Sequence, residues 1–532
     1  MGNDIKTGIY LCTCNGEIDK VIDVDSLAKE ASEWPGIITV HKDAFLCSDD
    51  AIRKVREDVK EFGLDRILIA ACSPFFKAEE FSGLGINKYL VERVNIREQC
   101  SRVHSNDPEN ATKKAKAMLR VFLEKVKYSH PLQLLQLPSL RSALVIGGGV
   151  AGINASIDIA GTDNEVFLIE KNPFLGGRVA GFHKYFPRMC PPSCGLELMF
   201  SKIKSNPNVH VLTSSEIDTI SGSPGNFEVL IRTSPRYVNE VCVLCGKCLE
   251  VCPQNAVVYP EGFSYPGIPA INRELCAVDC NKCAEICPVD AIDLDEDVKV
   301  NNIKAGAIVL ATGWEPFDPA PITELGYGRL ENVVTNMEFE RIAKKQKTFF
   351  DKPKRVAFIQ CVGSRDERYL SYCSDVCCMV SIKQALFLKE TNPDNEVYIF
   401  YNDIRTPGEY EELYQKARKA GVIFIKGIPS ELKQSEPGKI SFSVFDTVAG
   451  ERLDITTDMV VLATGMKPSQ GTIDLKDKIG IALNKNNFIE SHIQCYPQDT
   501  QRNAVFSAGC CRAPMDVSRS IESAGTAAIK TL

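Results

Sequence analysis

Short apolar runs alternate with amphipathic stretches along the first part of the chain. Two uninterrupted apolar runs end at Cys12 and Cys72, and their length and composition predict buried strands. Asp49–Phe62 has the spacing of an amphipathic helix, and Asn110–Lys127 is a longer helix that ends in cationic residues. This alternation predicts a small α/β domain over residues 1–130, followed by a linker.

A second region repeats the alternation around a glycine-rich turn. An apolar strand that begins at Arg141 runs into Gly147-Gly-Gly-Val-Ala-Gly152, and an apolar helix follows. The first glycine permits a tight bend, the third lets the backbone approach a pyrophosphate, and the last allows the helix to pack on the strand. The next strand ends at Glu170, at the distance expected for an acid that binds ribose hydroxyls. The pattern predicts a dinucleotide site with its phosphates on the helix N-terminus, formed by Gly147, Gly148, Gly149, Val150, Ala151, Gly152 and Glu170.

Cysteine spacing in the middle of the chain points to iron–sulfur chemistry. The runs 242–253 and 276–288 each hold four cysteines and end in Cys-Pro, which is typical of bacterial two-cluster ferredoxins. In these modules the fourth cysteine of each run ligates the other cluster. The rule predicts one cluster on Cys242, Cys245, Cys248 and Cys287, and the other on Cys276, Cys280, Cys283 and Cys252. One extra residue between Cys276 and Cys280 departs from the usual spacing, and a pair of zinc sites is the alternative.

Composition narrows the class of protein. A chain of 532 residues with 44% hydrophobic and 25% charged residues predicts three or four globular domains. A net charge of −7 argues against nucleic acid as a partner. No apolar segment approaches the roughly 18 residues of a membrane span, and the N-terminus lacks an apolar signal-peptide core. With 22 cysteines, these features predict cytoplasmic metal and redox chemistry in place of disulfides.

A second dinucleotide-type domain is predicted from the strand that begins at Lys354. Its turn reads Cys361-Val-Gly-Ser-Arg, so a cysteine side chain stands where a pyrophosphate needs bare backbone. We therefore expect this domain to keep its fold and to have lost the nicotinamide site. Four thiols within eighteen residues predict an unconventional cluster site, with buried reduced cysteines as the alternative: Cys361, Cys373, Cys377 and Cys378.

The roles of the remaining cysteines are less closely defined by the sequence. Five lie in the N-terminal domain, and four of them are predicted to converge at strand ends on a further cluster: Cys12, Cys14, Cys47, Cys72 and Cys100. We favour Cys47, Cys72 and Cys100 with one of Cys12 or Cys14, while a purely structural role is the alternative. Cys190 and Cys194 are compatible with a dithiol near a flavin, with ligands shared with another protein of a complex, or with structural burial. Cys495 and Cys511 receive no predicted role.

Further motifs resemble the glutathione- and thioredoxin-reductase class of flavoproteins. They are the segment from Lys171 to Gly176-Gly177-Arg178, the crossover strands that end in Thr312-Gly313 and Thr464-Gly465, and the stretch from Thr500 to Gly509. The resemblance implies FAD, with contacts from Lys171, Gly177, Arg178, Thr312, Gly313, Gly509 and Cys510. The class usually has Asp after Gly509, so Cys510 removes one FAD contact, which backbone donors before the helix around Asp516–Ala524 would have to replace. No paired acid and base lies beside these motifs in the sequence.

The order of the parts resembles the HdrA family, the iron–sulfur flavoproteins of heterodisulfide reductase, over essentially the whole chain. The motifs that carry this resemblance are Cys12-x-Cys14-x-Gly16, Ala71-Cys-Ser-Pro74, Asn95–Cys100 and Cys361–Asp366, together with the FAD turn and the ferredoxin runs. Arg188–Glu197 is more similar to flavoprotein subunits of quinone-interacting membrane-bound oxidoreductases. The implied fold is α/β: a thioredoxin-reductase-like flavoprotein with two dinucleotide domains, an inserted 2[4Fe–4S] ferredoxin module and an N-terminal α/β cluster domain.

We expect six segments. They are an N-terminal domain at 1–130, three parts of the FAD domain at 139–235, 291–350 and 466–532, the ferredoxin insertion at 236–290, and the degenerate nicotinamide-type domain at 351–465.

The resemblance also implies a function. The chain is expected to be an FAD- and iron–sulfur-dependent electron-transfer subunit of an anaerobic oxidoreductase complex, with two to four [4Fe–4S] clusters. It would divide or merge electrons between one-electron carriers and a partner reductase. The alternatives are an iron–sulfur NAD(P)H oxidoreductase of the glutamate synthase small-subunit type and a non-catalytic redox sensor or scaffold.

Partners are implied in the same way. We expect a homodimer that carries iron–sulfur subunits of the heterodisulfide reductase type and exchanges electrons with ferredoxin. Hydrogenase-linked, electron-transferring or membrane quinone-reactive subunits are further candidates, the last of which would place the protein at the periphery of a membrane complex. Longer family members continue into a second ferredoxin module, and with Leu532 as the last residue we expect a partner to supply that exit.

Overall fold

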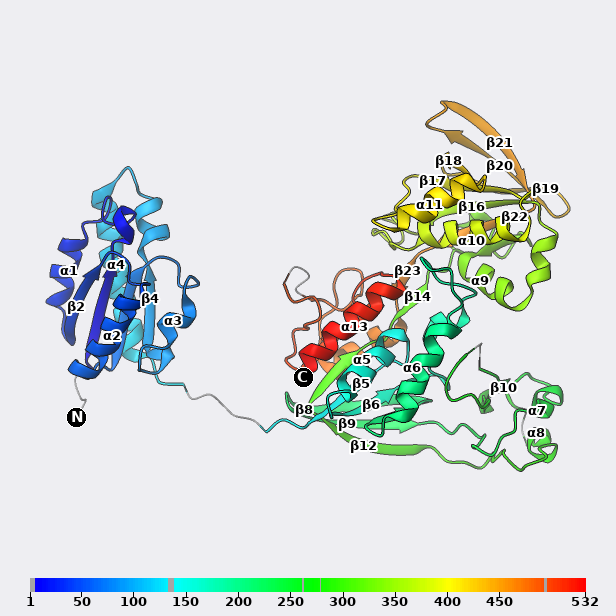
Figure 1. The fold of residues 1–532 in the computed structure, drawn as a ribbon, viewed down its shortest axis with the longest axis horizontal. Coiled ribbons are helices and arrows are strands. Elements are labelled where there is room, and N and C mark those ends of the chain that lie inside the picture. The colour runs from blue at the N-terminus through cyan, green and yellow to red at the C-terminus, as the bar shows by residue number, and fades with distance from the viewer. Residues whose placement is uncertain (1–4, 133–137, 261–262, 278, 492–494) are drawn as a thin grey trace. The chain divides into compact units, whose positions relative to one another are not determined.

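The chain divides into two compact units, Met1–Gln136 and Leu137–Leu532. The computed structural model describes residues 5–132, 138–260, 263–277, 279–491 and 495–532, and Figure 1 shows their elements. Residues 133–137 of the predicted linker lie outside the described residues.

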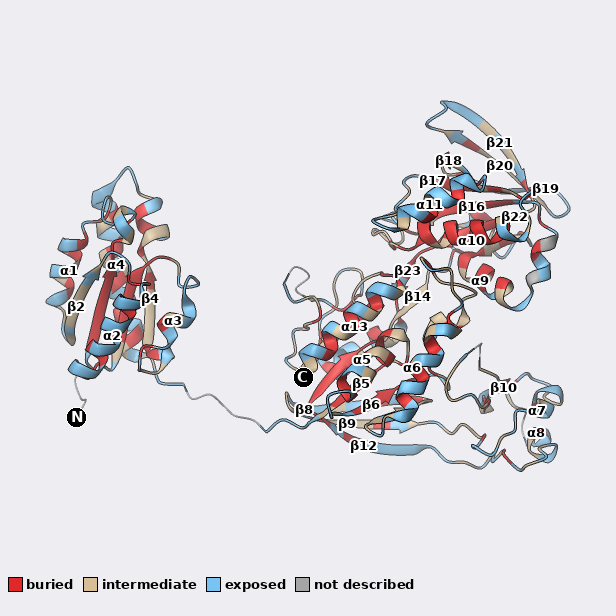
Figure 2. Ribbon diagram, viewed as in Figure 1, coloured by how far each residue is buried: buried red, intermediate tan, exposed pale blue. Residues whose placement is uncertain are grey.

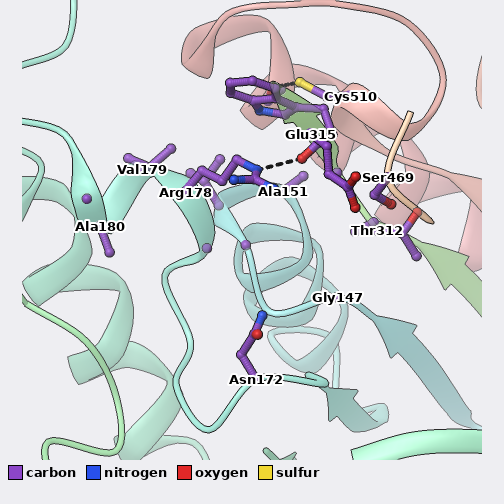
Figure 3. Close-up of a pocket in the computed structure, with 18 of the residues that line it drawn as sticks. Gly147, Ala151, Asn172, Arg178, Val179, Ala180, Thr312, Glu315, Ser469 and Cys510 are labelled. Atoms are coloured by element: carbon purple, nitrogen blue, oxygen red, sulfur yellow. Dashed lines mark hydrogen bonds between the residues drawn. The ribbon is translucent and has the colours of Figure 1, made fainter. Parts of the chain in front are cut away.

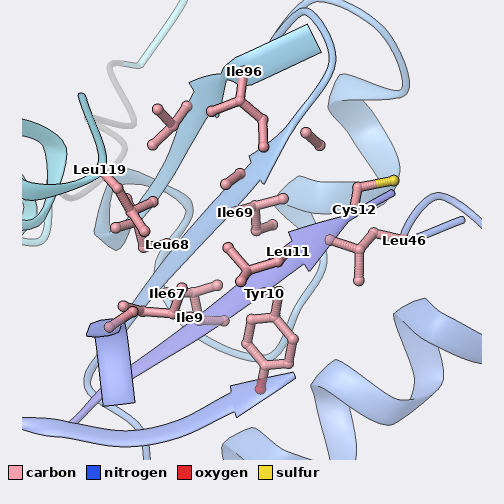
Figure 4. Close-up of a cluster of buried hydrophobic side chains, with 14 of the residues drawn as sticks. Ile9, Tyr10, Leu11, Cys12, Leu46, Ile67, Leu68, Ile69, Ile96 and Leu119 are labelled. Atoms are coloured by element: carbon pink, nitrogen blue, oxygen red, sulfur yellow. The ribbon is translucent and has the colours of Figure 1, made fainter. Parts of the chain in front are cut away.

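The first unit is a four-stranded parallel sheet in the order β2-β1-β3-β4. Its strands are β1 (Thr7–Cys12), β2 (Ile37–Asp43), β3 (Arg66–Ala71) and β4 (Val91–Asn95). Helices α1 (Val24–Ser32), α2 (Asp49–Phe62) and α4 (Pro108–Tyr128) contribute to one core with the sheet. The two apolar runs form the central strands β1 and β3, because a strand covered on both faces is apolar throughout. Figure 4 shows side chains of this core, and the first unit has an α/β architecture.

Three helix ends in this unit follow from local sequence. The Ser48 side chain accepts a hydrogen bond from the Ala51 amide at 3.2 Å and so caps α2 at its start. Gly63, with φ of 60°, ends the same helix. Asp107 caps α4 by accepting from the Asn110 amide at 3.2 Å, which explains why that helix starts before the predicted Asn110.

The second unit contains a five-stranded parallel sheet built from three separate stretches of chain. Its order is β24-β13-β5-β6-β7. The strands are β5 (Ser142–Ile146), β6 (Glu165–Ile169), β7 (Val209–Leu212), β13 (Ala307–Leu310) and β24 (Val505–Ser507). Helices α5 (Val150–Ala160), α6 (Ser193–Ser205) and α13 (Val517–Thr531) pack into one core with this sheet. An antiparallel sheet of β8 (Ser215–Ser223), β9 (Asn226–Thr233) and β12 (Lys299–Ala305) completes this part.

A second parallel sheet has the order β15-β22-β16-β17-β18. Its strands are β15 (Val333–Thr335), β16 (Arg355–Val362), β17 (Glu396–Tyr401), β18 (Ile423–Lys426) and β22 (Met459–Thr464). Helices α9 (Asn336–Lys345), α10 (Cys377–Thr391) and α11 (Tyr410–Lys419) pack with it, and β19 (Lys433–Glu436), β20 (Lys439–Asp446) and β21 (Glu451–Thr457) form a small antiparallel sheet. The pairing of β14 (Trp314–Pro316) with β23 (Met466–Pro468) joins the two parallel sheets. Two dinucleotide-type domains linked by paired crossover strands form the predicted thioredoxin-reductase-like fold.

The cysteine-rich runs form an insertion between β9 and β12. It contains the short helices α7 (Lys247–Glu250) and α8 (Lys282–Glu285) and the paired strands β10 (Val257–Val258) and β11 (Ala270–Ile271). Figure 2 shows that buried residues concentrate in the parallel sheets, whereas the insertion is mostly exposed. No helix in the described part of the chain is both long enough and apolar enough to cross a membrane.

Candidate functional site

A cavity of about 720 Å³ lies where the glycine-rich turn, the β14–β23 connection and helices α9 and α10 meet. Figure 3 shows part of its wall. Eleven of the predicted cofactor residues line it: Gly147, Gly149, Val150, Ala151, Glu170, Lys171, Gly177, Arg178, Thr312, Gly313 and Cys510. Three others, Gly148, Gly152 and Gly509, are not on its wall. The structure therefore gathers predicted residues from segments far apart in the sequence around one space.

The glycine-rich turn is shaped for an anion. A Cβ on Gly147, whose φ is +112°, would lie 2.3 Å from the Ala311 carbonyl oxygen, and a Cβ on Gly152 would lie 1.8 Å from the Gly147 oxygen. Both glycines are therefore required by the fold itself. A Cβ on Gly149 would meet nothing within 4 Å, and no side chain caps helix α5. This open helix N-terminus fits the pyrophosphate of a dinucleotide.

Glu170 organises the loop at the end of β6. Its buried carboxylate accepts hydrogen bonds from the Gly148 amide at 2.7 Å and from the Asn172 amide at 2.8 Å. The side chain thereby ties the glycine-rich turn to the next strand. The Asn172 side-chain amide donates a third hydrogen bond to this carboxylate at 2.6 Å. A carboxylate has about four acceptor positions, so Glu170 retains one for a ribose hydroxyl expected at this place.

Cys510 stands where the flavoprotein class has a carboxylate. Its buried thiol donates to the Met515 carbonyl at 3.3 Å and lies 3.7 Å from the Ser520 hydroxyl. Burial raises the pKa of the Cys510 thiol, so the group is neutral and does not replace the missing anion. Asp516 and Val517, at the N-terminus of α13, also line the cavity. That second helix N-terminus offers the backbone donors predicted for this position, and together with the open Gly149 it makes the cavity fit FAD.

The cavity wall also contains a buried ion pair that the sequence did not reveal. Lys383 Nζ lies 2.8 Å from the Glu340 carboxylate, and their side chains are only 5% and 4% exposed. Lys383 donates to the Lys184 carbonyl at 2.6 Å, and Glu340 accepts from Gln384 Nε2 at 2.7 Å. The pair lies on α9 and α10, away from the flavin motifs in sequence. The expectation that no acid and base stand beside those motifs is therefore corrected.

Seven of the eight ferredoxin-type cysteines, all except Cys280, fall into groups that combine both runs. Cys242, Cys245, Cys248 and Cys287 line one small cavity. Cys283 has Cys276 and Cys252 as electrostatic neighbours. The two crossover thiols occupy equivalent places, because Cys252 accepts from the Ala256 amide at 3.1 Å and Cys287 accepts from the Ala291 amide at 3.3 Å. This grouping is the arrangement that the crossover spacing predicts.

Tyr259 connects the ferredoxin module to the large cavity. It lines both the 720 Å³ cavity and the smaller cavity among the cysteines. Its buried hydroxyl has no oxygen or nitrogen partner among the described residues, but it hydrogen-bonds to the Cys248 thiol and has Cys242 and Cys245 as further electrostatic neighbours. A hydroxyl that contacts this sulfur can donate to it equally when the sulfur is a cluster ligand. Tyr259 and the cysteine thiols around it therefore fit an iron–sulfur cluster.

The four cysteines of the second domain also converge. Cys377 has Cys361, Cys378 and Cys373 as electrostatic neighbours, and burial raises the pKa of the Cys377 thiol well above its usual value. Burial likewise raises the pKa of Cys378 to about 11. Cys377 and Cys378 begin helix α10, whose Val380 and Lys383 line the large cavity. This thiol group and the cavity are thus connected by less than two turns of one helix.

In the N-terminal unit the structure groups four thiols at one edge of the sheet. Cys12 has Cys14 and Cys47 as electrostatic neighbours, and Cys72 has Cys14. Parallel strands β1 and β3 end at the same edge, which brings Cys12 and the residue after β3 together; Figure 4 shows Cys12 there. Cys100 is fully buried elsewhere, with its sulfur 3.5 Å from Met118 Sδ. The structure does not bring Cys100 to this group and places both Cys12 and Cys14 in it.

The other cysteines have individual environments. Cys190 donates to the Arg188 carbonyl at 3.5 Å, and Cys194 is exposed near the start of α6. Cys511 is fully buried and donates to the Leu310 carbonyl at 3.1 Å, whereas Cys495 is exposed. Across the described residues, no three His, Cys, Asp or Glu side chains lie close enough to hold a single metal ion. A cubane cluster makes a different demand, because each of its four ligands binds a different iron.

Comparisons with known proteins agree with this organisation. Residues 241–291 match a family model described as a 4Fe-4S dicluster domain. The HdrA protein of the H(2):CoB-CoM heterodisulfide,ferredoxin reductase of Methanothermobacter thermautotrophicus is 35% identical over 556 residues, which cover 99% of this chain and 84% of the relative. An HdrA-like protein of Archaeoglobus profundus is 33% identical over 607 residues, which cover 98% and 85%. Among solved structures, thioredoxin reductase of T. acidophilum is 15% identical and covers 74% of this chain and 98% of its own, with a TM-score of 0.42.

Proposed function

The chain belongs to the HdrA family of heterodisulfide reductases, and from this premise we propose that it exchanges electron pairs at a flavin with single electrons on two iron–sulfur branches. Membership makes it part of an oxidoreductase complex, as a flavoprotein with a 4Fe–4S dicluster domain. The finer proposal is that electron pairs are divided or merged at the flavin, which is flavin-based bifurcation or confurcation.

One observation carries this proposal: a single cavity adjoins two separate cysteine groups. On one side, Tyr259 lines both the cavity and the space among the ferredoxin cysteines. On the other side, Val376 lines the cavity immediately before Cys377. FAD supplies the chemistry that interconverts two-electron and one-electron transfer. A cavity that adjoins two one-electron sites is the arrangement that division of an electron pair requires.

The chain's own residues have distinct proposed roles around that cavity. The α5 N-terminus and Gly149 bind the pyrophosphate, and Glu170 binds the ribose. Arg178 is held by its Nε hydrogen bond to the Trp314 carbonyl at 2.6 Å and lies over the Trp314 ring at 5.4 Å. Lys383 forms its ion pair with Glu340 on the wall, and Glu340 fixes its position. A fixed cation of this kind stabilises negative charge that develops on a bound group.

The ligand sets proposed for the clusters follow the grouping of the thiols. The ferredoxin module holds two clusters by the crossover sets. Cys361, Cys373, Cys377 and Cys378 hold a third, and Cys12, Cys14, Cys47 and Cys72 hold a fourth. The cysteine sulfurs must be deprotonated to bind iron, so the raised thiol pKa values at Cys12 and Cys378, each about 11, describe the chain without iron.

Partners are proposed from the relatives. The M. thermautotrophicus relative is named for ferredoxin and the CoB-CoM heterodisulfide. We place this chain in a homodimeric core that carries iron–sulfur subunits and exchanges single electrons with ferredoxin. An iron–sulfur NAD(P)H oxidoreductase is the less favoured function, because Phe317 and the cysteine group fill the turn of the second domain.

Anaerobic flavin reduction tests the proposal. The purified chain, loaded with FAD and iron, should lose its flavin absorbance when a reduced ferredoxin is added. Cys248→Ser should block this reduction by removing a ligand of the ferredoxin branch. Cys377→Ser should leave flavin reduction intact and prevent onward transfer to the second domain. If no low-potential donor reduces the wild-type flavin, the sensor or scaffold alternative is the better account.

A further inference from the structure

Arginine side chains distinguish the two unconventional cysteine groups from the ferredoxin module. In the N-terminal unit, Arg97 Nη1 lies 3.1 Å from Cys14 Sγ, and Arg93 Nη2 lies 4.0 Å from Cys72 Sγ. Arg97 is half-buried, with 21% of its side chain exposed, so its charge is only partly screened by solvent. A guanidinium therefore faces two of the four grouped thiols.

The second domain repeats this arrangement on an unrelated segment. Arg365 hydrogen-bonds to the Cys361 thiol, and Arg405 is an electrostatic neighbour of both Cys361 and Cys378. Arg365 is held in place by an ion pair with Asp403 at 2.8 Å. Two cysteine groups with different ligand spacing thus share one feature, a pair of arginines.

Nearby carboxylates do not cancel these charges. Arg97 pairs with Glu98 at 2.7 Å. Burial raises the pKa of the Cys72 thiol, while Arg97 and Arg93 each lower it more strongly than Glu98 raises it. Burial also raises the pKa of Cys361, and Arg365 is the largest opposing influence. The arginines are thus the charged side chains with the strongest influence on Cys72 and Cys361.

The ferredoxin module has a different environment. Of its thiols, Cys248 and Cys283 have other thiols, backbone amides and, for Cys248, Tyr259 as electrostatic neighbours. Lys247 lines the cavity that Cys242, Cys245, Cys248 and Cys287 share, so among the described residues a lysine, and not an arginine, stands on that wall. Arg273 donates to the Cys280 carbonyl at 2.9 Å, so its nearest contact is with the backbone and not with a sulfur.

We propose that Arg97 and Arg365 set reduction potentials, so that the clusters of the two arginine-flanked groups accept electrons more readily than the ferredoxin pair. This inference rests on the cluster sites of the proposed function. Reduction of a cluster adds one negative charge, and both a nearby cation and a hydrogen bond to a ligand sulfur stabilise the reduced form. The ferredoxin module is then the low-potential branch, and the other two groups form the high-potential branch.

A redox titration followed by electron paramagnetic resonance tests the inference on the full chain loaded with iron. In the wild type, the two arginine-flanked clusters should become reduced before the ferredoxin pair. Arg97→Gln should shift the one-electron equilibrium of the N-terminal cluster about tenfold toward the oxidised form, which corresponds to about 59 mV. Arg365→Gln should do the same for the second-domain cluster only. Arg97→Lys, which keeps the charge, should retain most of the wild-type potential.

Matched controls lie in the same loops. Arg102 is five residues from Arg97 and pairs with Glu17 at 3.3 Å, and Arg368 is three residues from Arg365 and pairs with Asp366 at 2.7 Å. Arg102→Gln and Arg368→Gln should leave every potential unchanged. The inference is overturned if the ferredoxin pair becomes reduced first or if Arg97→Gln leaves the N-terminal cluster unmoved. An iron content of about eight atoms, sufficient for the ferredoxin pair alone, would overturn the proposed cluster sites as well. An iron content sufficient for all four clusters, with the ferredoxin pair reduced first, would overturn this inference only.

Discussion

Lys383 and Glu340 form a 2.8 Å ion pair on the wall of the flavin cavity, and neither side chain is more than 5% exposed. The two residues come from adjacent helices of the second domain, α10 and α9, so that domain contributes charge to a site whose binding motifs lie in the first. Loss of the nicotinamide-type turn has therefore not removed the second domain from the cavity.

Breaking this pair should destabilise the protein and alter the flavin. Lys383→Met should lower the free energy of unfolding by about 3–5 kcal/mol, because it leaves the Glu340 carboxylate buried and unpaired. The midpoint of urea unfolding measures this loss, and the double variant Lys383→Met/Glu340→Leu should recover much of it. Loss of the cation should also lower the flavin reduction potential. Lys389→Met, on the same helix, is the control, because Lys389 donates to the Pro393 carbonyl at an exposed site. Equal stability of Lys383→Met and wild type would contradict the role given to the pair.

Two glycines of one turn should respond differently to the same substitution. Gly149→Ala should fold normally, because its Cβ would meet nothing within 4 Å, and it should lose FAD by obstructing the pyrophosphate. Gly152→Ala should misfold, because its Cβ would lie 1.8 Å from the Gly147 oxygen. The ratio of flavin to protein after desalting measures the first effect, and circular dichroism measures the second. Gly267→Ala, which also meets nothing within 4 Å but lies away from the cavity wall, is the control. Full FAD content in Gly149→Ala would show that the pyrophosphate binds elsewhere.

Iron content should distinguish the N-terminal cysteines that bind a cluster from Cys100, which should not. Cys47→Ser should lower the iron content by about four atoms from the roughly sixteen expected for four clusters. Cys100→Ser should retain all of it, because the Cys100 sulfur contacts Met118 and the electrostatic neighbours of its thiol include Lys114 but no other cysteine. Chemical iron analysis after anaerobic reconstitution gives the answer. If Cys100→Ser loses four irons and Cys12→Ser and Cys14→Ser each lose none, the set favoured by the structure is wrong.

The sequence predicted most of the fold because its signals are local. The glycine-rich turn, the apolar runs that became β1, β3 and β5, and the spacing of Cys242 to Cys287 each describe one segment and need no knowledge of its neighbours. The predicted α/β domain and the two dinucleotide-type sheets followed from them. The match of residues 241–291 to a 4Fe-4S dicluster domain confirms the type of the insertion.

The site depended on contacts between distant segments, which spacing does not encode. Nothing in the sequence around Lys383 indicates that Glu340 lies beside it, because neither the amphipathic pattern of α9 nor the mostly buried helix α10 specifies a partner. Cys12 ends strand β1, whereas Cys100 lies in the helical turn Arg97–Arg102 after β4, and its side chain packs into the core against α4. Tyr259 carried no signal at all, and its importance arises from lining two cavities at once.

The second domain should not accept electrons from a nicotinamide. Strand β16 leads into Cys361, which has a φ of +58°, and a Cβ on Gly363 would lie 2.3 Å from the Phe317 ring. A bulky ring and four grouped thiols therefore occupy the place where a pyrophosphate would need bare backbone. The flavin absorbance of the isolated, FAD-loaded chain should stay unchanged when NADH or NADPH is added anaerobically, and dithionite should bleach it in the same cuvette. Cys361→Gly should not create the activity, because Phe317 still fills the turn. Rapid bleaching by NADH without any partner protein would show that this domain retains a working nicotinamide site, and would return the NAD(P)H oxidoreductase alternative to first place.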